Sequence, residues 1–164
     1  MQLNGGVAMG KVLMIYTSQT GNTEMLTDMI AHELQQLSLE VEMKTFDLDL
    51  IDIEQLSNYD AVLIGTYTWD DGELPYESED FYVDLEGANL NGQVFGVYGS
   101  GDTCYDTFGL AIDLMGDRLK NLGATMVPER LKVDLSPNKE DVKRSVSYAK
   151  LVVKTMQVNS KKAV

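Results

Sequence analysis

A buried strand that runs directly into a polar loop and then into a helix constrains this chain more than any other feature. Apolar residues occupy 12–16, and Thr17-Ser18-Gln19-Thr20-Gly21-Asn22-Thr23 follows at once. A helical pattern of apolar residues begins directly behind this loop. A helix N-terminus offers unpaired N–H groups and the positive end of a dipole, so small hydrogen-bonding residues at such a junction suit a phosphate. An ordinary polar turn capped by Asn22 or Thr23 would share the pattern and stays open at this point.

The loop has no cationic side chain to hold an anion. Lys and Arg are missing from residues 12–43, so the donors must be neutral. A P-loop requires Gly-Lys-Ser/Thr, and a dinucleotide fingerprint requires three glycines at fixed spacing. Neither is present, which excludes both of these nucleotide sites.

Strand patterns alternate with helical patterns along the rest of the chain, which predicts an α/β domain with a doubly wound parallel sheet. We expect five strands, at 11–16, 39–46, 60–65, 93–98 and 125–134, in the order 2-1-3-4-5. Helices are expected at 23–37, 79–87, 106–121 and 139–156, with a short helical turn near 52–56. Residues 1–10 are expected to be a flexible lead-in, 11–156 the domain, and 157–164 a C-terminal tail.

Two of the helices have apolar stripes that indicate their buried faces. The spacing in 106–121 predicts that Phe108, Ala111, Ile112, Met115 and Leu119 are buried. The stripe of the last helix consists of Val142, Val146, Ala149, Val153 and Met156.

Unusual loops follow three of the predicted strands, at 17–23, 66–75 and 99–106. Ligands of such sheets bind outside the C-terminal strand ends, where the strand order reverses. Strands one, three and four are neighbours in the expected order, so the three loops should converge on one site.

The second and third loops each carry an aromatic side chain among polar residues. Trp69 lies in an acidic loop, where a surface Trp is unusual unless it binds something, although it could fold back over the domain. Tyr105 follows Gly99-Ser100-Gly101-Asp102, where glycines would let the backbone approach a ligand, although a plain glycine-rich turn would look the same. Two aromatic faces suit a planar ligand.

Together, Ser-x-Thr-Gly-Asn-Thr, Thr-x-Thr-Trp with acidic residues behind it, and Gly-x-Gly-Asp-x-x-Tyr resemble the flavin loops of flavodoxins, over about 11–154. The resemblance implies that the first loop binds the phosphate of flavin mononucleotide (FMN), that Trp69 covers the inner face of the ring and Tyr105 the outer face, and that Ser100, Gly101 and Asp102 meet its pyrimidine edge. The full set of implied cofactor-binding residues is Ser18, Gln19, Thr20, Gly21, Asn22, Thr23, Thr66, Tyr67, Thr68, Trp69, Asp70, Asp71, Gly72, Ser100, Gly101, Asp102, Tyr105 and Gly109.

The chain is similar to the short-chain bacterial members of that family, because it has no room for the extra loop that splits the fifth strand of the long-chain members. It departs from the family pattern in two places. Tyr67 is bulky where a small residue is frequent, so it could compete with Trp69 for the ring. Asp70 stands where Gly is usual.

The charge of the chain is strongly acidic and uneven. The net charge is −13, and residues 45–117 contain 17 Asp and Glu but no Lys, Arg or His. Nucleic acid and anionic membrane surfaces are therefore poor partners, whereas a basic protein face is a good one. An acidic surface that only aids solubility is the alternative.

These features predict a low-potential one-electron carrier, not an enzyme, and we expect a cytoplasmic monomer without a membrane span. The resemblance implies a reductase such as an NADPH-dependent flavodoxin/ferredoxin reductase as donor, and haem monooxygenases or other redox enzymes as acceptors. An FMN-dependent NAD(P)H quinone or nitro reductase on the same fold is the main alternative. A receiver domain is disfavoured because strand one ends in Tyr16-Thr17 and not in paired acids.

Overall fold

The computed structural model describes residues 10–69 and 72–162 and contains one parallel sheet of five strands. The order is β2-β1-β3-β4-β5, as predicted, and every neighbouring pair is parallel. The strands are β1 (Lys11–Tyr16), β2 (Glu40–Thr45), β3 (Ala61–Tyr67), β4 (Val94–Gly101) and β5 (Thr125–Asp134). Their carboxyl ends therefore meet at one edge of the sheet.

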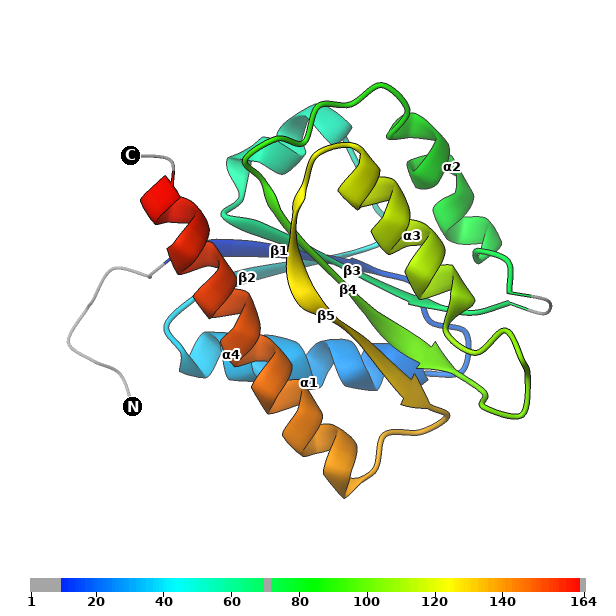
Figure 1. Ribbon diagram of the computed structural model, residues 1–164. Coiled ribbons are helices and arrows are strands. Elements are labelled where there is room, and N and C mark those ends of the chain that lie inside the picture. Colours follow the sequence, from blue (N-terminus) through cyan, green and yellow to red (C-terminus); the bar gives the residue numbers. More distant parts are fainter. Residues whose placement is uncertain (1–9, 70–71, 163–164) are drawn as a thin grey trace.

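Helices cover both faces of this sheet (Figure 1). One face packs against α1 (Asn22–Gln36) and α4 (Lys139–Lys162), and the other against α2 (Tyr76–Asp84), α3 (Leu110–Asn121) and the short 3₁₀ helix η1 (Ile53–Asn58). Side chains of a strand point alternately to its two faces, so Val12 of β1 joins one core and Leu13 the other. No helix in 10–69 or 72–162 is long and apolar enough to span a bilayer.

β3 and β4 extend further than the sequence pattern indicated. They end at Tyr67 and Gly101 and not at 65 and 98, because Thr66 pairs with Gly99 and Tyr67 with Ser100. A Cβ on Gly99 would lie 1.6 Å from the carbonyl oxygen of Thr66. Gly99 therefore permits a close approach between two strands, not an approach of a ligand as its position in the motif suggested.

Two predicted helix boundaries are wrong by several residues. α2 spans Tyr76–Asp84 and not 79–87, and α3 begins at Leu110 and not at 106. Gly109, with φ +71°, precedes the first turn of α3 in a conformation that a helix cannot include. Phe108 consequently lies outside the helix and is only partly buried, whereas the rest of its predicted stripe is buried.

α4 buries a stripe one residue earlier than its valines predicted. Asp141, Ser145, Tyr148, Ala149 and Val152 are buried, while Val142 is 46% exposed. The polar members of the buried stripe are satisfied locally: Asp141 and Asn138 exchange backbone-to-side-chain hydrogen bonds, and the Tyr148 hydroxyl donates to the Val97 carbonyl. Burial of these groups therefore leaves no polar atom of theirs unpaired.

α4 also continues through Lys162, so most of the predicted tail is helical. The Asn159 side chain holds this last turn, because it accepts from the Thr125 hydroxyl and donates to the Gly92 carbonyl. No hydrophobic periodicity reveals such a polar attachment.

An ion cluster joins α3 to β5. Asp113 lies 2.9 Å from Arg130 and 2.5 Å from Lys132, and Arg130 also contacts Asp117. Burial disfavours the charge of the Asp113 carboxyl, but hydrogen bonds from Lys132 and Arg130 outweigh it and lower its pKa below the ordinary value. The folded state therefore favours ionised Asp113.

We expect Asp113→Asn to lower the free energy of unfolding at neutral pH by about 1 kcal/mol, a value that allows for partial solvent screening. A carboxyl group whose pKa is lowered by folding stabilises the folded state when the pH is above the ordinary carboxyl pKa. This contribution is lost as the pH falls through the pKa of the folded state. The difference between the two proteins should therefore shrink toward about pH 3, as measured by urea unfolding. Asp117→Asn is the control, since Asp117 is more exposed and contacts Arg130 alone among these cations; an equal loss there would contradict a special role of Asp113.

Candidate functional site

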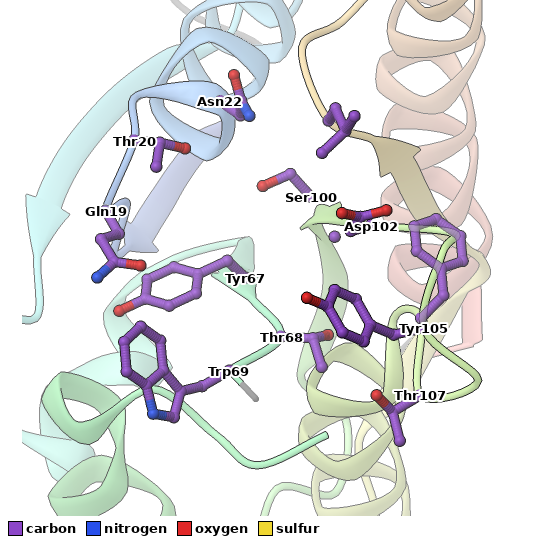
Figure 2. Close-up of a pocket in the computed structure, with 13 residues that line it drawn as sticks. Gln19, Thr20, Asn22, Tyr67, Thr68, Trp69, Ser100, Asp102, Tyr105 and Thr107 are labelled. Carbon is purple, nitrogen blue, oxygen red and sulfur yellow. The ribbon is translucent and has the colours of Figure 1, made fainter. Parts of the chain in front are cut away.

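A cavity of about 240 Å³ lies at the carboxyl ends of β1, β3 and β4 (Figure 2). All three loops that the sequence singled out contribute to it, so the predicted convergence is confirmed. We call it the strand-end cavity. It is lined by Gln19, Thr20, Asn22, Tyr67, Thr68, Trp69, Ser100, Gly101, Asp102, Tyr105, Thr107, Phe108 and Leu135.

The first loop ends in a helix without a side-chain cap. Gly21 is the N-cap residue in the left-handed conformation (φ +90°), so neither Asn22 nor Thr23 takes that place. The Glu24 amide donates to Ser18 Oγ at 3.2 Å, and the Met25 amide to the Gly21 carbonyl. The amides of Asn22 and Thr23, which open the helix, have no intrahelical acceptor, and this leaves donors for an anion.

Thr23 connects this loop to the strand that carries the third loop. Its side chain is buried, and its hydroxyl lies 2.8 Å from Ser100 Oγ. One turn further along α1, Thr27 donates to the Thr23 carbonyl and lies 2.7 Å from the buried Tyr98 hydroxyl. Burial raises the pKa of Tyr98, which keeps this hydroxyl chain neutral. The chain fixes α1 against the end of β4.

The second loop is a tight turn that places Trp69 at the cavity. The Trp69 amide donates to the Glu73 carbonyl, and the amides of Gly72 and Glu73 both donate to the Trp69 carbonyl. Gly72, at φ +97°, packs so closely on Leu110 that a Cβ would lie 2.4 Å from that side chain. Asp70 and Asp71, both predicted site residues, lie outside the described residues. Trp69 is 39% exposed, so a ligand can reach its ring.

Tyr67 lies beside Trp69 and meets it edge-on, with ring centroids 6.2 Å apart. Its hydroxyl donates to Glu77 at 3.3 Å. Burial and the neighbouring Glu77 carboxylate raise the pKa of Tyr67 to about 12, so the phenol is neutral. Both rings border the cavity. Tyr67 and Trp69 are therefore both placed to contact the inner face of a flavin ring, which is the competition that the sequence indicated.

The third loop places Tyr105 across the cavity from these two rings (Figure 2). Tyr105 is 62% exposed. Asp102 Oδ1 accepts from the Cys104 amide at 2.8 Å and shapes the turn before Tyr105. Aromatic side chains thus bound the cavity on two opposite sides, which is the arrangement that a planar ring system requires.

Ten of the predicted site residues line the cavity, and six others among the described residues do not. The ten that line it are Gln19, Thr20, Asn22, Tyr67, Thr68, Trp69, Ser100, Gly101, Asp102 and Tyr105. The six that do not line the cavity support the conformation of the loops, and they are Ser18, Gly21, Thr23, Thr66, Gly72 and Gly109.

Three lining residues were missed: Thr107, Phe108 and Leu135. The apolar stripe assigned Phe108 to a helix core, and the end of the fifth strand was not considered as a source of site residues. The position of Leu135, directly after the β5 pattern, was the signal that could have found it.

The cavity combines neutral hydrogen-bond donors at one end with aromatic faces at the other. A phosphate fits the first part and a flat heterocycle the second, with Ser100 and Asp102 available to its edge. FMN has this combination of groups, so the residues present fit the cofactor that the resemblance implied.

Comparisons with known proteins agree with this fit. The family model for flavodoxin matches residues 14–147. "Probable flavodoxin 1" of Bacillus subtilis is 40% identical over 143 residues, which cover 87% of this chain and 89% of the relative. Oxidised Flavodoxin 1 from Bacillus cereus superimposes with a TM-score of 0.83 at 37% identity and covers 88% of this chain and 97% of its own.

A second solved structure, a short-chain flavodoxin associated with a non-canonical PDU bacterial microcompartment, superimposes with a TM-score of 0.85 at 34% identity. The match covers 90% of this chain and 99% of that one. The fold, the cavity and these similarities together show that the chain belongs to the flavodoxin family, the electron-transfer proteins whose cofactor is FMN.

Proposed function

We propose that this flavodoxin is a low-potential one-electron carrier that holds FMN in the strand-end cavity, between a reductase that supplies electrons and redox enzymes that consume them. The observation that supports this most is the placement of aromatic side chains from the ends of β3 and β4 and the loops that follow them on opposite sides of a cavity that also reaches the start of α1. The Asn22 and Thr23 amides would hold the phosphate. Trp69 and Tyr105 would hold the two faces of the ring.

Bound FMN supplies electron storage in single steps. The lining residues bind and orient it but offer little for substrate chemistry, since none of those described is a His, Cys, Lys or Arg. A nicotinamide dinucleotide is a polyanion that proteins recognise with cations and helix ends. The cavity lining therefore favours a carrier over a reductase that takes hydride directly from NAD(P)H.

The acidic surroundings oppose the arrival of an electron. At about 10 Å and an effective dielectric constant of about 40, one carboxylate costs about 0.8 kcal/mol, or about 35 mV for one electron, before screening by salt. Asp102 lines the cavity, Glu77 of α2 contacts the cavity residue Tyr67, and α2 carries three more exposed acids, Glu79, Asp80 and Asp84. A few such charges are enough to make the reduced protein a strong donor.

The same acids suit partners with basic faces, such as an NADPH-dependent flavodoxin/ferredoxin reductase and haem monooxygenases. Of the 13 Lys and Arg, 11 lie between 118 and 162, in the segment that forms the end of α3, β5 and α4. The acidic segment 45–117 forms two of the cavity loops. This asymmetry would turn the cavity toward a basic partner during approach.

Electron transfer to a basic partner should slow as salt rises above the concentration that gives a Debye length of about 10 Å, because the ions screen this steering. Stopped-flow reduction of cytochrome c, a basic haem protein, by the reduced flavodoxin measures the rate. A neutral acceptor such as a small quinone is the control, and its rate should change little. A rate with cytochrome c that is flat over the same range would assign the acids to solubility.

The proposal as a whole is tested with the purified holoprotein, NADPH and a flavodoxin/ferredoxin reductase. The flavin absorbance should bleach only when the reductase is present, and addition of cytochrome c should restore it. NADPH oxidation by the flavodoxin alone, with a quinone or nitroaromatic acceptor, would instead support the reductase alternative.

A further inference from the structure

The Tyr105 loop, residues 102–109, is fastened to β5 at both of its ends. At its start, the Thr103 amide donates to Asp134 Oδ1 at 3.0 Å. Directly before the loop, the Gly101 carbonyl accepts from the Leu135 amide at 2.7 Å. These two hydrogen bonds run in opposite directions between the end of β4 and the end of β5, so they fix the loop in both position and orientation.

The far end of the loop packs on another residue of β5. Gly109 takes a φ of +71°, and a Cβ there would lie 2.5 Å from the Lys132 side chain. The Lys132 ammonium is in turn held by Asp113 at 2.5 Å. The aliphatic part of the Lys132 side chain therefore packs against Gly109 and supports the far end of the loop.

Tyr105 has little support of its own. Its side chain is 62% exposed, and its backbone contacts stay within the loop: its amide donates to the Asp102 carbonyl, and its carbonyl accepts from Phe108. The direction of the ring therefore follows from the path of the loop backbone. Asp134 contacts that backbone from outside the loop, two residues before Tyr105.

We propose that Asp134 is a positioning residue for the flavin site: its carboxylate holds the Thr103 amide and thereby keeps Tyr105 across the cavity from Trp69. This inference rests on the proposed role of Tyr105 at the outer face of the ring. Leu135, which follows Asp134, lines the cavity and has a φ of +54°, unusual for a branched side chain. The end of β5 thus belongs to the site although no glycine or aromatic motif marks it.

Three variants of the full-length holoprotein separate the hydrogen bond from the charge. Asp134→Ala removes both the acceptor and the charge, whereas Asp134→Asn removes only the charge, since an amide oxygen can still accept from Thr103. Asp106→Asn removes a charge from the same loop at an exposed position. We expect Asp134→Ala to raise the dissociation constant of FMN by about threefold to tenfold, and the two Asn variants to agree with each other within about twofold.

Two further readouts distinguish positioning from general stability. Hydrogen exchange of the Thr103 amide should speed up in Asp134→Ala but not in Asp134→Asn. In a double-mutant cycle, Asp134→Ala should add nothing to the loss of affinity caused by Tyr105→Ala, because both act through the same ring.

Additive losses in the cycle, or equal effects of Asp134→Ala and Asp134→Asn, would overturn the proposal. If FMN binds and transfers electrons normally in every variant, the positioning role fails while the proposed function stands. If wild-type protein binds no FMN, the proposed function itself fails.

Discussion

Apoprotein should bind FMN at least about a thousandfold more tightly than it binds riboflavin. Each hydrogen bond to a charged phosphate contributes about 1.5–3 kcal/mol, and three of them correspond to at least about three powers of ten in affinity. The donors available are the open amides at the start of α1, which Gly21 exposes through its left-handed conformation, and the neutral side chains of Gln19, Thr20 and Asn22. Riboflavin would keep the ring contacts and lose all of these.

Fluorescence titration of the apoprotein with each flavin measures both affinities. Asn22→Ala is an internal control, because it removes a side chain at the phosphate end and should weaken FMN while leaving riboflavin unchanged. Equal affinities for the two flavins would contradict the assignment of the first loop to the phosphate.

Removal of either stacking ring should have the second large effect, a loss of affinity for FMN. We expect Trp69→Ala and Tyr105→Ala each to weaken FMN binding by about tenfold or more, because each loses burial of an aromatic surface as well as the stacking preference. Flavin fluorescence should be strongly quenched in the native protein and should partly return in each variant. Titration and steady-state emission of the same samples give both quantities.

Tyr67 supplies the control that the structure calls for. It lies on the same side of the cavity as Trp69 and meets it edge-on, so Tyr67→Ala tests which ring is at the inner face. Tyr67→Phe keeps the ring and removes the hydrogen bond to Glu77. A large loss with Tyr67→Ala, together with no loss with Trp69→Ala, would show that the inner face was assigned to the wrong aromatic side chain.

The sequence alone predicted the sheet order and the convergence of three loops because both depend on patterns that are local in the chain. Alternation of apolar runs with helical stripes marks the strands, and the strand ends then follow. Two of the errors, both in α4, arose where polar contacts decide the outcome. Asn159 extends α4 by bonding to Thr125 and Gly92, which are distant in the chain. Asp141 is buried together with its local hydrogen-bond exchange with Asn138, which a hydrophobic stripe does not reveal.

The sequence by itself determined which loops make the site, since Trp69, Tyr105 and the neutral first loop each have a local chemical reason to be where they are. Only the tertiary structure decided how those loops are held. Thr23 faces Ser100 inside the protein, Gly99 admits the Thr66 backbone, and Asp134 fastens the Tyr105 loop from a strand 31 residues away. These contacts join residues far apart in the chain, and their partners are fixed by packing and register, which no local pattern records.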